Sequence, residues 1–449
     1  MQQKIPRILL AGTNSGCGKT TVTCAILQAL VDRGMRVGAF KCGPDYIDPM
    51  FHRRITGAKS ANLDPFFFDE NTLRCLLARN GADREISVVE GVMGFYDGVG
   101  MTVRASTYQV ARATETPVVL VVNARGAALS VLATVSGFVS LYPDNHIRGV
   151  IFNQCAEKTY AALARELEQR LGLRALGFLP RLAGAALESR HLGLVTADEV
   201  RDLKDKMHAL AAQAEQAVDL DGLLALADEA PAVGWEDILL PRLESVRIAV
   251  ARDQAFCFYY EDSLDALRRM GAELVDFSPL TDPALPENIH GLYLGGGYPE
   301  LYTAELSRNE SMRRSVCAAL ERGLPCIAEC GGFMYLNETV GGAPMAGYLK
   351  GRCTDTGRLT RFGYVTLQAE SDNLLCRAGE EIPAHEFHYW DCTRPGDGFT
   401  ARKPDGRQWS CAVSTPRLYA GFPHFHFYAN PAFARNFYEA CIKEKHSHD

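Results

Sequence analysis

Short apolar runs alternate with longer amphipathic stretches through the first half of the chain. The runs are rich in Val, Ile and Leu without polar alternation, which is typical of parallel strands covered on both faces. The stretches between them, such as 21–33 and 160–171, have helical periodicity. We therefore expect a doubly wound α/β domain. Its strands are predicted at residues 7–11, 35–41, 86–90, 117–122 and 147–153.

The alternation weakens between residues 223 and 241, where proline and acidic residues occur without clear periodicity. A second series follows, with strands expected at 247–251, 273–277, 291–294 and 325–328. A chain of 449 residues also exceeds the usual size of one core. We predict two tandem α/β domains, at residues 1–225 and 245–441, joined by a linker at 226–244.

Composition narrows the class of protein. Hydrophobic residues make up 47% and charged residues 22%, as in a globular protein. The net charge of −7 gives no basic footprint, so we expect no nucleic-acid partner. The longest apolar runs are far shorter than the ~20 residues of a membrane span. The N-terminal apolar stretch, of about five residues, is too short for a signal-peptide core. The 14 cysteines form no zinc-finger pattern, and we expect a cytoplasmic protein, free of the membrane, with reduced thiols.

The first predicted strand is followed by a glycine-rich loop that opens the first predicted helix. Glycines let backbone N–H groups approach a phosphate, and the helix N-terminus adds partial positive charge. In this pattern Lys19 reaches the β- and γ-phosphates, and the Thr20 hydroxyl holds Mg²⁺. Thr13 stands where the usual pattern begins with glycine. The predicted ATP-binding loop is Gly12, Thr13, Asn14, Ser15, Gly16, Cys17, Gly18, Lys19, Thr20 and Thr21.

Acidic residues follow the second and third predicted strands, at the carboxyl edge where ligands of open α/β sheets bind. Asp45, Asp48 and Glu90 are therefore candidate oxygen ligands for Mg²⁺. A turn role is the alternative for the two aspartates, which lie between prolines. Asp97 is a candidate at the same edge, with a turn role as its alternative. The Asn153 amide is predicted to recognise adenine or to cap a helix.

A cysteine with two glycines after it ends the strand predicted at 325–328. Such a sharp strand-to-helix turn exposes a nucleophile, so we predict that Cys330 is catalytic, with its thiolate favoured by the following helix N-terminus. The backbone N–H groups of Gly296, Gly297 and Gly331 are predicted to form an oxyanion hole.

A nucleophilic thiol needs a base, and the segment Phe422-Pro423-His424-Phe425-His426 offers two candidates. If this segment is extended, His424 and His426 point to the same face. A zinc site made of the two histidines and a cysteine is a competing interpretation, although no fourth ligand is evident.

These motifs, taken in order, resemble the cobyrinate a,c-diamide synthases, two-domain enzymes of corrin biosynthesis. The resemblance runs nearly end to end, and no single motif decides it. The motifs that carry it are GTNSGCGKTT, KCGPDYIDP, EGVMGFYDG, the segment Ser189-Arg190-His191-Leu192-Gly193-Leu194, GGGYPELY, ECGGFMYL, HEFHY and the HFHF ending. Two departures are Asn123, where an aspartate is expected, and Gly421-Phe422-Pro423 before the histidines.

The resemblance implies a dethiobiotin synthetase-like P-loop domain fused to a class I glutamine amidotransferase domain that lacks the usual third carboxylate of the triad. Cys330 then matches the nucleophile and His424 the activating histidine, with His426 as the second choice. Asp45, Asp48 and Glu90 match the acidic residues of the Mg-ATP and substrate site. Tyr46 and Asp97 become candidates for contact with the corrinoid.

The implied substrates are ATP, glutamine and cobyrinic acid or a related tetrapyrrole, with Mg²⁺ as cofactor. The implied reaction amidates the a and c carboxylates through an acyl phosphate. Hydrogenobyrinate and nickel-sirohydrochlorin remain alternative substrates. Cobyrate synthase is another macrocycle-amidating enzyme, but the PDYIDP segment favours an a,c-diamide synthase over it. A ParA/MinD-like ATPase switch is the rival from another class, but Asn14 replaces its signature lysine. The sequence does not decide oligomeric state, and we carry a homodimer as a hypothesis.

Overall fold

Seven parallel strands form the central sheet of the first half of the protein. In the computed structural model, which describes residues 1–181 and 203–447, the chain divides into the units Met1–Ile238 and Leu239–Asp449. The motif at 189–194 lies outside the described residues. The first sheet has the order β4-β3-β5-β2-β6-β7-β8. Its strands are β2 (Arg7–Gly12), β3 (Val37–Cys42), β4 (Ser60–Leu63), β5 (Ile86–Glu90), β6 (Val118–Asn123), β7 (Ile147–Asn153) and β8 (Arg174–Leu179).

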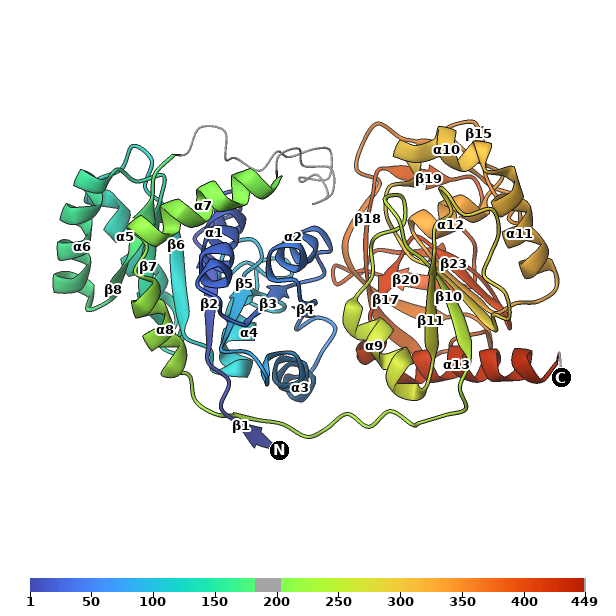
Figure 1. Cartoon of the computed structure of the whole chain (residues 1–449), viewed down its shortest axis with the longest axis horizontal. Coiled ribbons are helices and arrows are strands. Elements are labelled where there is room, and N and C mark those ends of the chain that lie inside the picture. Colours follow the sequence, from blue (N-terminus) through green and yellow to red (C-terminus); the bar gives the residue numbers. More distant parts are fainter. Residues whose placement is uncertain (182–202, 448–449) are drawn as a thin grey trace. The chain divides into compact units, whose positions relative to one another are not determined.

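Helices connect these strands (Figure 1). From β2 the chain crosses through α1 to β3 on one side, whereas from β5 it crosses through α4 to β6 on the other side. Because such crossovers are right-handed, α1 and α4 lie on opposite faces, as the predicted doubly wound fold requires. The helices are α1 (Lys19–Asp32), α2 (Ile47–Thr56), α3 (Glu70–Gly81), α4 (Thr107–Thr114), α5 (Ser130–Leu141), α6 (Glu157–Leu171), α7 (Leu203–Ala217) and α8 (Leu220–Asp228).

The segment between the two units is partly structured. Helix α8 ends at Asp228, and β9 (Val233–Gly234) pairs with β1 (Gln2–Gln3), so the chain start is tied to the end of the first unit. Residues 235–246 contain neither helix nor strand (Figure 1). The segment predicted as a linker, 226–244, therefore includes the last turn of α8 and β9.

The second unit contains a six-stranded, mostly parallel sheet of order β11-β10-β12-β13-β23-β22, in which only β22 is antiparallel to its neighbour. Its strands are β10 (Arg247–Ala251), β11 (Glu273–Phe277), β12 (Gly291–Leu294), β13 (Cys326–Glu329), β22 (Val413–Thr415) and β23 (Leu418–Gly421). Its helices are α9 (Glu261–Met270), η1 (Pro299–Tyr302), α10 (Thr303–Arg308), α11 (Glu310–Glu321), α12 (Gly331–Leu336), η2 (Phe427–Ala429) and α13 (Pro431–His446). The unit thus extends past the predicted limit at residue 441.

Two further sheets complete this unit. The five-stranded sheet has the order β21-β20-β17-β18-β24 and pairs every strand with an antiparallel neighbour. Its strands are β17 (Arg361–Ala369), β18 (Glu381–His388), β20 (Phe399–Arg402), β21 (Gln408–Cys411) and β24 (His424–Phe425). The smaller sheet contains β14 (Thr339–Val340), β15 (Ala343–Pro344), β16 (Arg352–Asp355) and β19 (Trp390–Cys392). Along the described chain, no helix is long and apolar enough to cross a bilayer.

Candidate functional sites

The predicted phosphate loop connects β2 to α1, as the sequence indicates. Gly16 and Gly18 have φ angles of 78° and 95°, which favour glycine because a Cβ is strained there. A Cβ on Gly12 would lie 2.5 Å from the Cys17 sulfur and 2.8 Å from the Lys19 nitrogen. The loop is therefore a tight backbone turn whose exposed part, residues 14–16, faces solvent.

The Lys19 ammonium lies inside this loop. Its Nζ donates hydrogen bonds to the carbonyl oxygens of Met93 and, at 3.3 Å, Asn14. Burial lowers the pKa of Lys19. Both partners are neutral carbonyls, so an anionic phosphate would be a stronger partner for this cation.

Asn153, at the end of β7, contacts the loop from beneath. Its Nδ2 donates to the Cys17 carbonyl at 2.9 Å, and a Cβ on Gly18 would collide with that amide. The helix-cap interpretation is wrong, because α6 starts later with Ala156 as its N-cap. The side-chain oxygen of Asn153 is not part of this contact, and its contact with adenine stays a prediction.

A buried ionic cluster lies at the carboxyl edge of β3 and β5. The Lys41 Nζ forms ion pairs with Asp48 and, at 3.1 Å, with Glu90. Burial and the neighbouring Glu90 raise the pKa of Asp48. Burial alone also raises the pKa of Glu90, but Lys41 and His52 together bring it well below its usual value. The cluster therefore holds Glu90 as a carboxylate.

Sequence reasoning did not find Lys41 or His52. His52 Nε2 lies 2.7 Å from Glu90 Oε2, and His52 Nδ1 lies 3.2 Å from the Ser60 hydroxyl. The KCGPDYIDP motif contains Lys41, but no spacing rule links it to a carboxylate 49 residues away.

The remaining candidates of this unit have distinct environments. Asp45 Oδ1 accepts the backbone N–H groups of Ile47 and Asp48 at 2.7 and 3.0 Å, so this oxygen stabilises the start of α2, as its turn alternative describes. Asp97 is exposed and accepts the Gly94 N–H at 2.8 Å, which is again a turn contact. The Tyr46 side chain is buried.

The oxygen donors of this edge fit Mg²⁺. Thr20 Oγ1 lies 2.7 Å from Glu90 Oε1 and 3.4 Å from Asp48 Oδ1. Hydroxyl and carboxylate oxygens are the donors that Mg²⁺ prefers, and this ion usually takes its other ligands from phosphates and water. Within the described residues, no three His, Cys, Asp or Glu side chains are placed to hold a metal by themselves.

Cys330 lies on the sharp turn between β13 and α12 that the sequence predicts. Its φ of 48° and ψ of −101° are strained for a residue with a Cβ. Its backbone N–H donates to the Gly421 carbonyl at 2.7 Å, and the Gly332 N–H donates to the Gly295 carbonyl at 3.0 Å. These two bonds tie the turn to the ends of β23 and β12.

The expected low thiol pKa is wrong. Burial raises the pKa of Cys330, and the carboxylate of Glu300 raises it further, whereas the Gly331 N–H lowers it by less. Helix α12 is only six residues long, so its N-terminus offers little compensation. The thiol therefore needs a base.

Residues 295–297, which follow β12, are all glycines and lie against the turn that contains Cys330. Gly297 has a φ of 155°, and a Cβ there would lie 2.1 Å from the Ala255 carbonyl. A Cβ on Gly331 would lie 3.0 Å from the Gly297 nitrogen and 3.4 Å from the Gly296 carbonyl carbon. The structure thus brings the three predicted oxyanion residues together beside Cys330.

His424 lies beside the same glycine turn, and its imidazole is paired with the Glu329 carboxylate. Its Nδ1 is 3.1 Å from Glu329 Oε2, and both side chains are buried. A Cβ on Gly296 would lie 2.5 Å from His424 Cε1 and 3.2 Å from His424 Nε2. The Cε1–Nε2 edge of the imidazole therefore faces the glycine turn, which also lies against Gly331.

His426 has a different environment. Strand β24 ends at Phe425, and His426 Nδ1 accepts the Tyr428 N–H at 3.1 Å as the cap of η2. Its ring packs at 4.9 Å from that of Tyr260. The two histidines thus contact separate groups, and the donor set of the predicted zinc site does not converge in the described chain.

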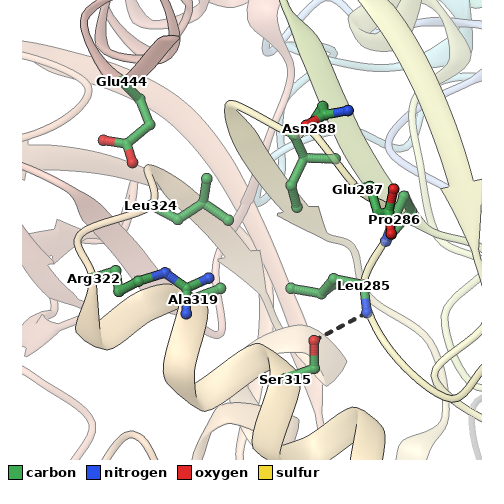
Figure 2. Close-up of a pocket in the computed structure, with 10 residues that line it drawn as sticks. Leu285, Pro286, Glu287, Asn288, Ser315, Ala319, Arg322, Leu324 and Glu444 are labelled. Atoms are coloured by element: carbon green, nitrogen blue, oxygen red, sulfur yellow. Dashed lines mark hydrogen bonds between the residues drawn. The ribbon is translucent and has the colours of Figure 1, made fainter. Parts of the chain in front are cut away.

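A hollow of about 400 Å³ lies elsewhere in the second unit (Figure 2). One hydrogen bond, from the Leu285 N–H to the Ser315 hydroxyl at 3.1 Å, crosses its lining. None of the predicted site residues lines it. The lining consists of Leu285, Pro286, Glu287, Asn288, Ile289, Ser315, Ala319, Arg322, Leu324 and Glu444.

Comparison with known proteins assigns a family to each half of the chain. Residues 8–195 match the CobQ/CobB/MinD/ParA nucleotide binding domain, and residues 247–432 match the CobB/CobQ-like glutamine amidotransferase domain. The chain is therefore an enzyme that joins a nucleotide-binding domain to a domain using glutamine as amide donor.

Relatives that span both halves refine this class. A cobyrinate a,c-diamide synthase of Listeria monocytogenes serotype 4b is 40% identical, over 94% of this chain and 97% of its own. Another, of Caldanaerobacter subterraneus, is 38% identical, over 96% of this chain and 98% of its own. This chain belongs to the cobyrinate a,c-diamide synthase family. Among solved structures, PurLQS from Thermotoga maritima covers 44% of this chain and 98% of its own, with 18% identity and a TM-score of 0.34, too weak a likeness to add to the assignment.

Proposed function

We propose that this enzyme converts the a and c carboxylates of cobyrinic acid to amides, with ATP and glutamine as co-substrates. The relatives that match nearly the whole chain are cobyrinate a,c-diamide synthases, which supports this substrate. The observation that carries the proposal is that one chain contains both halves of the machinery. These are a phosphate loop beside a buried acidic cluster, and a cysteine on a strained turn beside a histidine.

In the first unit, a carboxylate oxygen of the macrocycle attacks the γ-phosphorus of ATP, which gives an acyl phosphate and ADP. A free carboxylate repels nucleophiles, whereas an acyl phosphate has a good leaving group. Lys19 neutralises phosphate charge, and the residues of the loop orient the nucleotide through their N–H groups. Thr20, Asp48 and Glu90 would hold Mg²⁺, which would supply further charge neutralisation when bound.

On the substrate side, we assign Asp97 and Tyr46 to contact with the macrocycle. Asp97 is exposed, and one of its carboxylate oxygens accepts the Gly94 N–H. Tyr46 lies between Asp45 and the start of α2. Asp45, whose Oδ1 accepts two backbone N–H groups, would also hold the metal with its carboxylate.

In the second unit, Cys330 attacks the side-chain carbonyl of glutamine and forms a glutamyl thioester. His424 takes the thiol proton and transfers it to the departing ammonia, and water then hydrolyses the thioester to glutamate. The N–H groups of Gly296, Gly297 and Gly331 stabilise the tetrahedral oxyanion. Ammonia attacks the acyl phosphate, and phosphate leaves as the amide forms.

Cys330→Ala tests this division of labour. We expect the variant to lose glutamine-dependent amidation while it keeps ATP-dependent amidation with free ammonia, because the first unit is unchanged. Cys326→Ala is a matched control, since Cys326 is also buried and lies at the start of β13, four residues from Cys330. Product formation from both nitrogen sources is measured. Retention of glutamine use by Cys330→Ala would contradict the proposal.

A further inference from the structure

Glu329 immediately precedes the nucleophile and is 1% exposed. Its carboxylate faces three hydrogen-bonding groups. Oε2 lies 3.1 Å from His424 Nδ1, Oε1 lies 3.2 Å from the Tyr293 hydroxyl, and the backbone N–H of Phe425 also points to the carboxylate. A hydroxyl and a backbone N–H both donate readily, which suits an ionised carboxylate that can only accept.

The contact with Nδ1 decides the tautomer of His424. When Glu329 accepts the Nδ1 proton, the lone pair is left on Nε2, where a general base needs it. That edge of the ring faces Gly296. Gly296 and Gly297 also contact Gly331, which directly follows the nucleophile. The lone pair and Cys330 are thus adjacent to the same glycine turn.

Other ionisable groups near His424 do not supply this negative charge. His385 lies opposite His424 in the strand register, and burial lowers its pKa to about 3. Burial likewise lowers the pKa of His388 to about 4. Burial raises the pKa of Tyr293, which keeps that hydroxyl neutral. Glu386 follows His385 on β18, so its side chain points to the opposite face of the sheet from His385 and His424.

We propose that Glu329 is the positioning residue that orients His424, so that the site is a Cys330–His424–Glu329 triad whose carboxylate comes from the residue before the nucleophile. This inference rests on the proposed roles of Cys330 and His424. It differs from the resemblance, which implies that this class lacks the usual third carboxylate. The carboxylate is present, but it comes from β13.

The pair has a defined dependence on pH. Burial raises the pKa of Glu329 to about 8 and lowers that of His424 to about 3. The competent state, a carboxylate beside a neutral imidazole, therefore forms when the pair loses a proton as pH rises. We expect kcat/KM for glutamine to rise with pH as this proton is lost, and activity to disappear as pH falls. This rising part of the pH profile is called the acid limb below.

Glu329→Gln is the first test. The amide keeps the shape but not the charge, so we expect kcat/KM for glutamine to fall about 100-fold or more. The acid limb should move to lower pH, because the buried carboxylate that holds the proton is gone. Glu329→Asp, which keeps the charge, should lose less activity and retain a limb close to that of the wild type. Near-UV circular dichroism and thermal unfolding of the second unit serve as the control for folding, because amidation with free ammonia depends on the first unit.

Tyr293→Phe is the second variant and predicts a shift of opposite sign. Loss of the hydroxyl donor disfavours the carboxylate, so the acid limb should move to higher pH. A limb unmoved in both Glu329→Gln and Tyr293→Phe would overturn the inference, as would wild-type kcat/KM in Glu329→Gln. If Glu329→Gln fails to fold, the shift in Tyr293→Phe decides. Glutamine use by Cys330→Ala or His424→Ala would instead show that the proposed function is wrong.

Discussion

Lys41 is the cation on which the buried acidic edge of the first unit depends. Its ammonium and the carboxylates of Asp48 and Glu90 are each at most 5% exposed as side chains. Removing one partner of a buried pair leaves the others as uncompensated charges, which is more costly than loss of a surface pair. Lys41 therefore matters for stability as well as for the site.

We predict that Lys41→Met lowers the free energy of unfolding of the first unit by about 3–5 kcal/mol. Arg36→Met is the matched control, because Arg36 pairs with Glu85 at the surface, where an ion pair contributes at most about 1 kcal/mol. Urea denaturation of both variants at one pH measures the difference. Equal losses in the two variants would show that Lys41 does not hold the cluster.

Lys19→Ala should produce the reverse of the Cys330→Ala phenotype. Without this ammonium the γ-phosphate loses its main protein cation, so we expect amidation to be abolished with glutamine and with ammonia alike. Hydrolysis of glutamine should continue, because Cys330 and His424 are unchanged. Glutamate release and amide formation are measured in parallel. Amidation by Lys19→Ala at the wild-type rate would rule out the assigned role of the loop.

At the residue scale, the sequence predicts a site well when its residues lie together in one short motif. The phosphate loop and the turn at Cys330 are short motifs, and the structure has both where they are expected. Glu329 lies within the ECGGFMYL motif, yet its proposed role depends on His424, which is 95 residues later. The Glu90 contact of His52 spans 38 residues. Such pairs come from tertiary packing, which local spacing does not encode.

At the scale of elements, the end of β7 supports the start of α1. Asn153 and Asn123 are directly paired in the register of β7 and β6. The Asn153 amide donates to the phosphate loop, whereas Asn123 Oδ1 accepts the N–H of Arg125. Two equivalent asparagines therefore have different consequences for the nucleotide.

We predict that Asn153→Ala weakens ATP binding about tenfold, because the Cys17 carbonyl loses its donor and the loop loosens. Asn123→Ala should leave ATP binding within about twofold, since its contact is local. Titration of each variant with Mg-ATP gives the two affinities. The prediction is contradicted if Asn123→Ala weakens binding as much as Asn153→Ala does.

The predicted bounds are accurate where a run of apolar residues forms the centre of a strand. β5, β7, β10, β11 and β12 have the predicted bounds, and β2, β3, β6 and β13 differ by at most two residues at either end. The short strand β4 was not predicted, because its sequence SANL contains two polar residues, of which Ser60 bonds His52. The antiparallel sheets of the second unit were also missed. Most of their strands have four residues or fewer. The two longer ones, β17 with nine residues and β18 with eight, alternate mainly between buried and half-buried positions and contain no continuous apolar run.

At the scale of the whole molecule, the chain divides into two compact units between Ile238 and Leu239. Each contains its own central sheet, and the phosphate loop belongs wholly to the first. We expect two thermal transitions, one for each unit. Because ligand binding stabilises only the unit that binds, a Mg-bound ATP analogue should raise the midpoint temperature of one of them. At 100 times Kd the stabilisation is about 2.7 kcal/mol.

Scanning calorimetry with and without a non-hydrolysable ATP analogue and Mg²⁺ measures this effect. Lys19→Ala is the control and should show a smaller shift, because its loop lacks the ammonium. A single transition that the analogue raises as a whole would show that the units unfold together.

The most direct test of the central claim is mass spectrometry of cobyrinic acid incubated with the enzyme, Mg-ATP and glutamine. The account predicts two successive acid-to-amide mass steps that stop at the diamide and disappear without ATP. Conversion of hydrogenobyrinate or nickel-sirohydrochlorin, with cobyrinic acid unchanged, would retain the mechanism and replace the substrate. Unchanged mass for all three macrocycles would contradict the account.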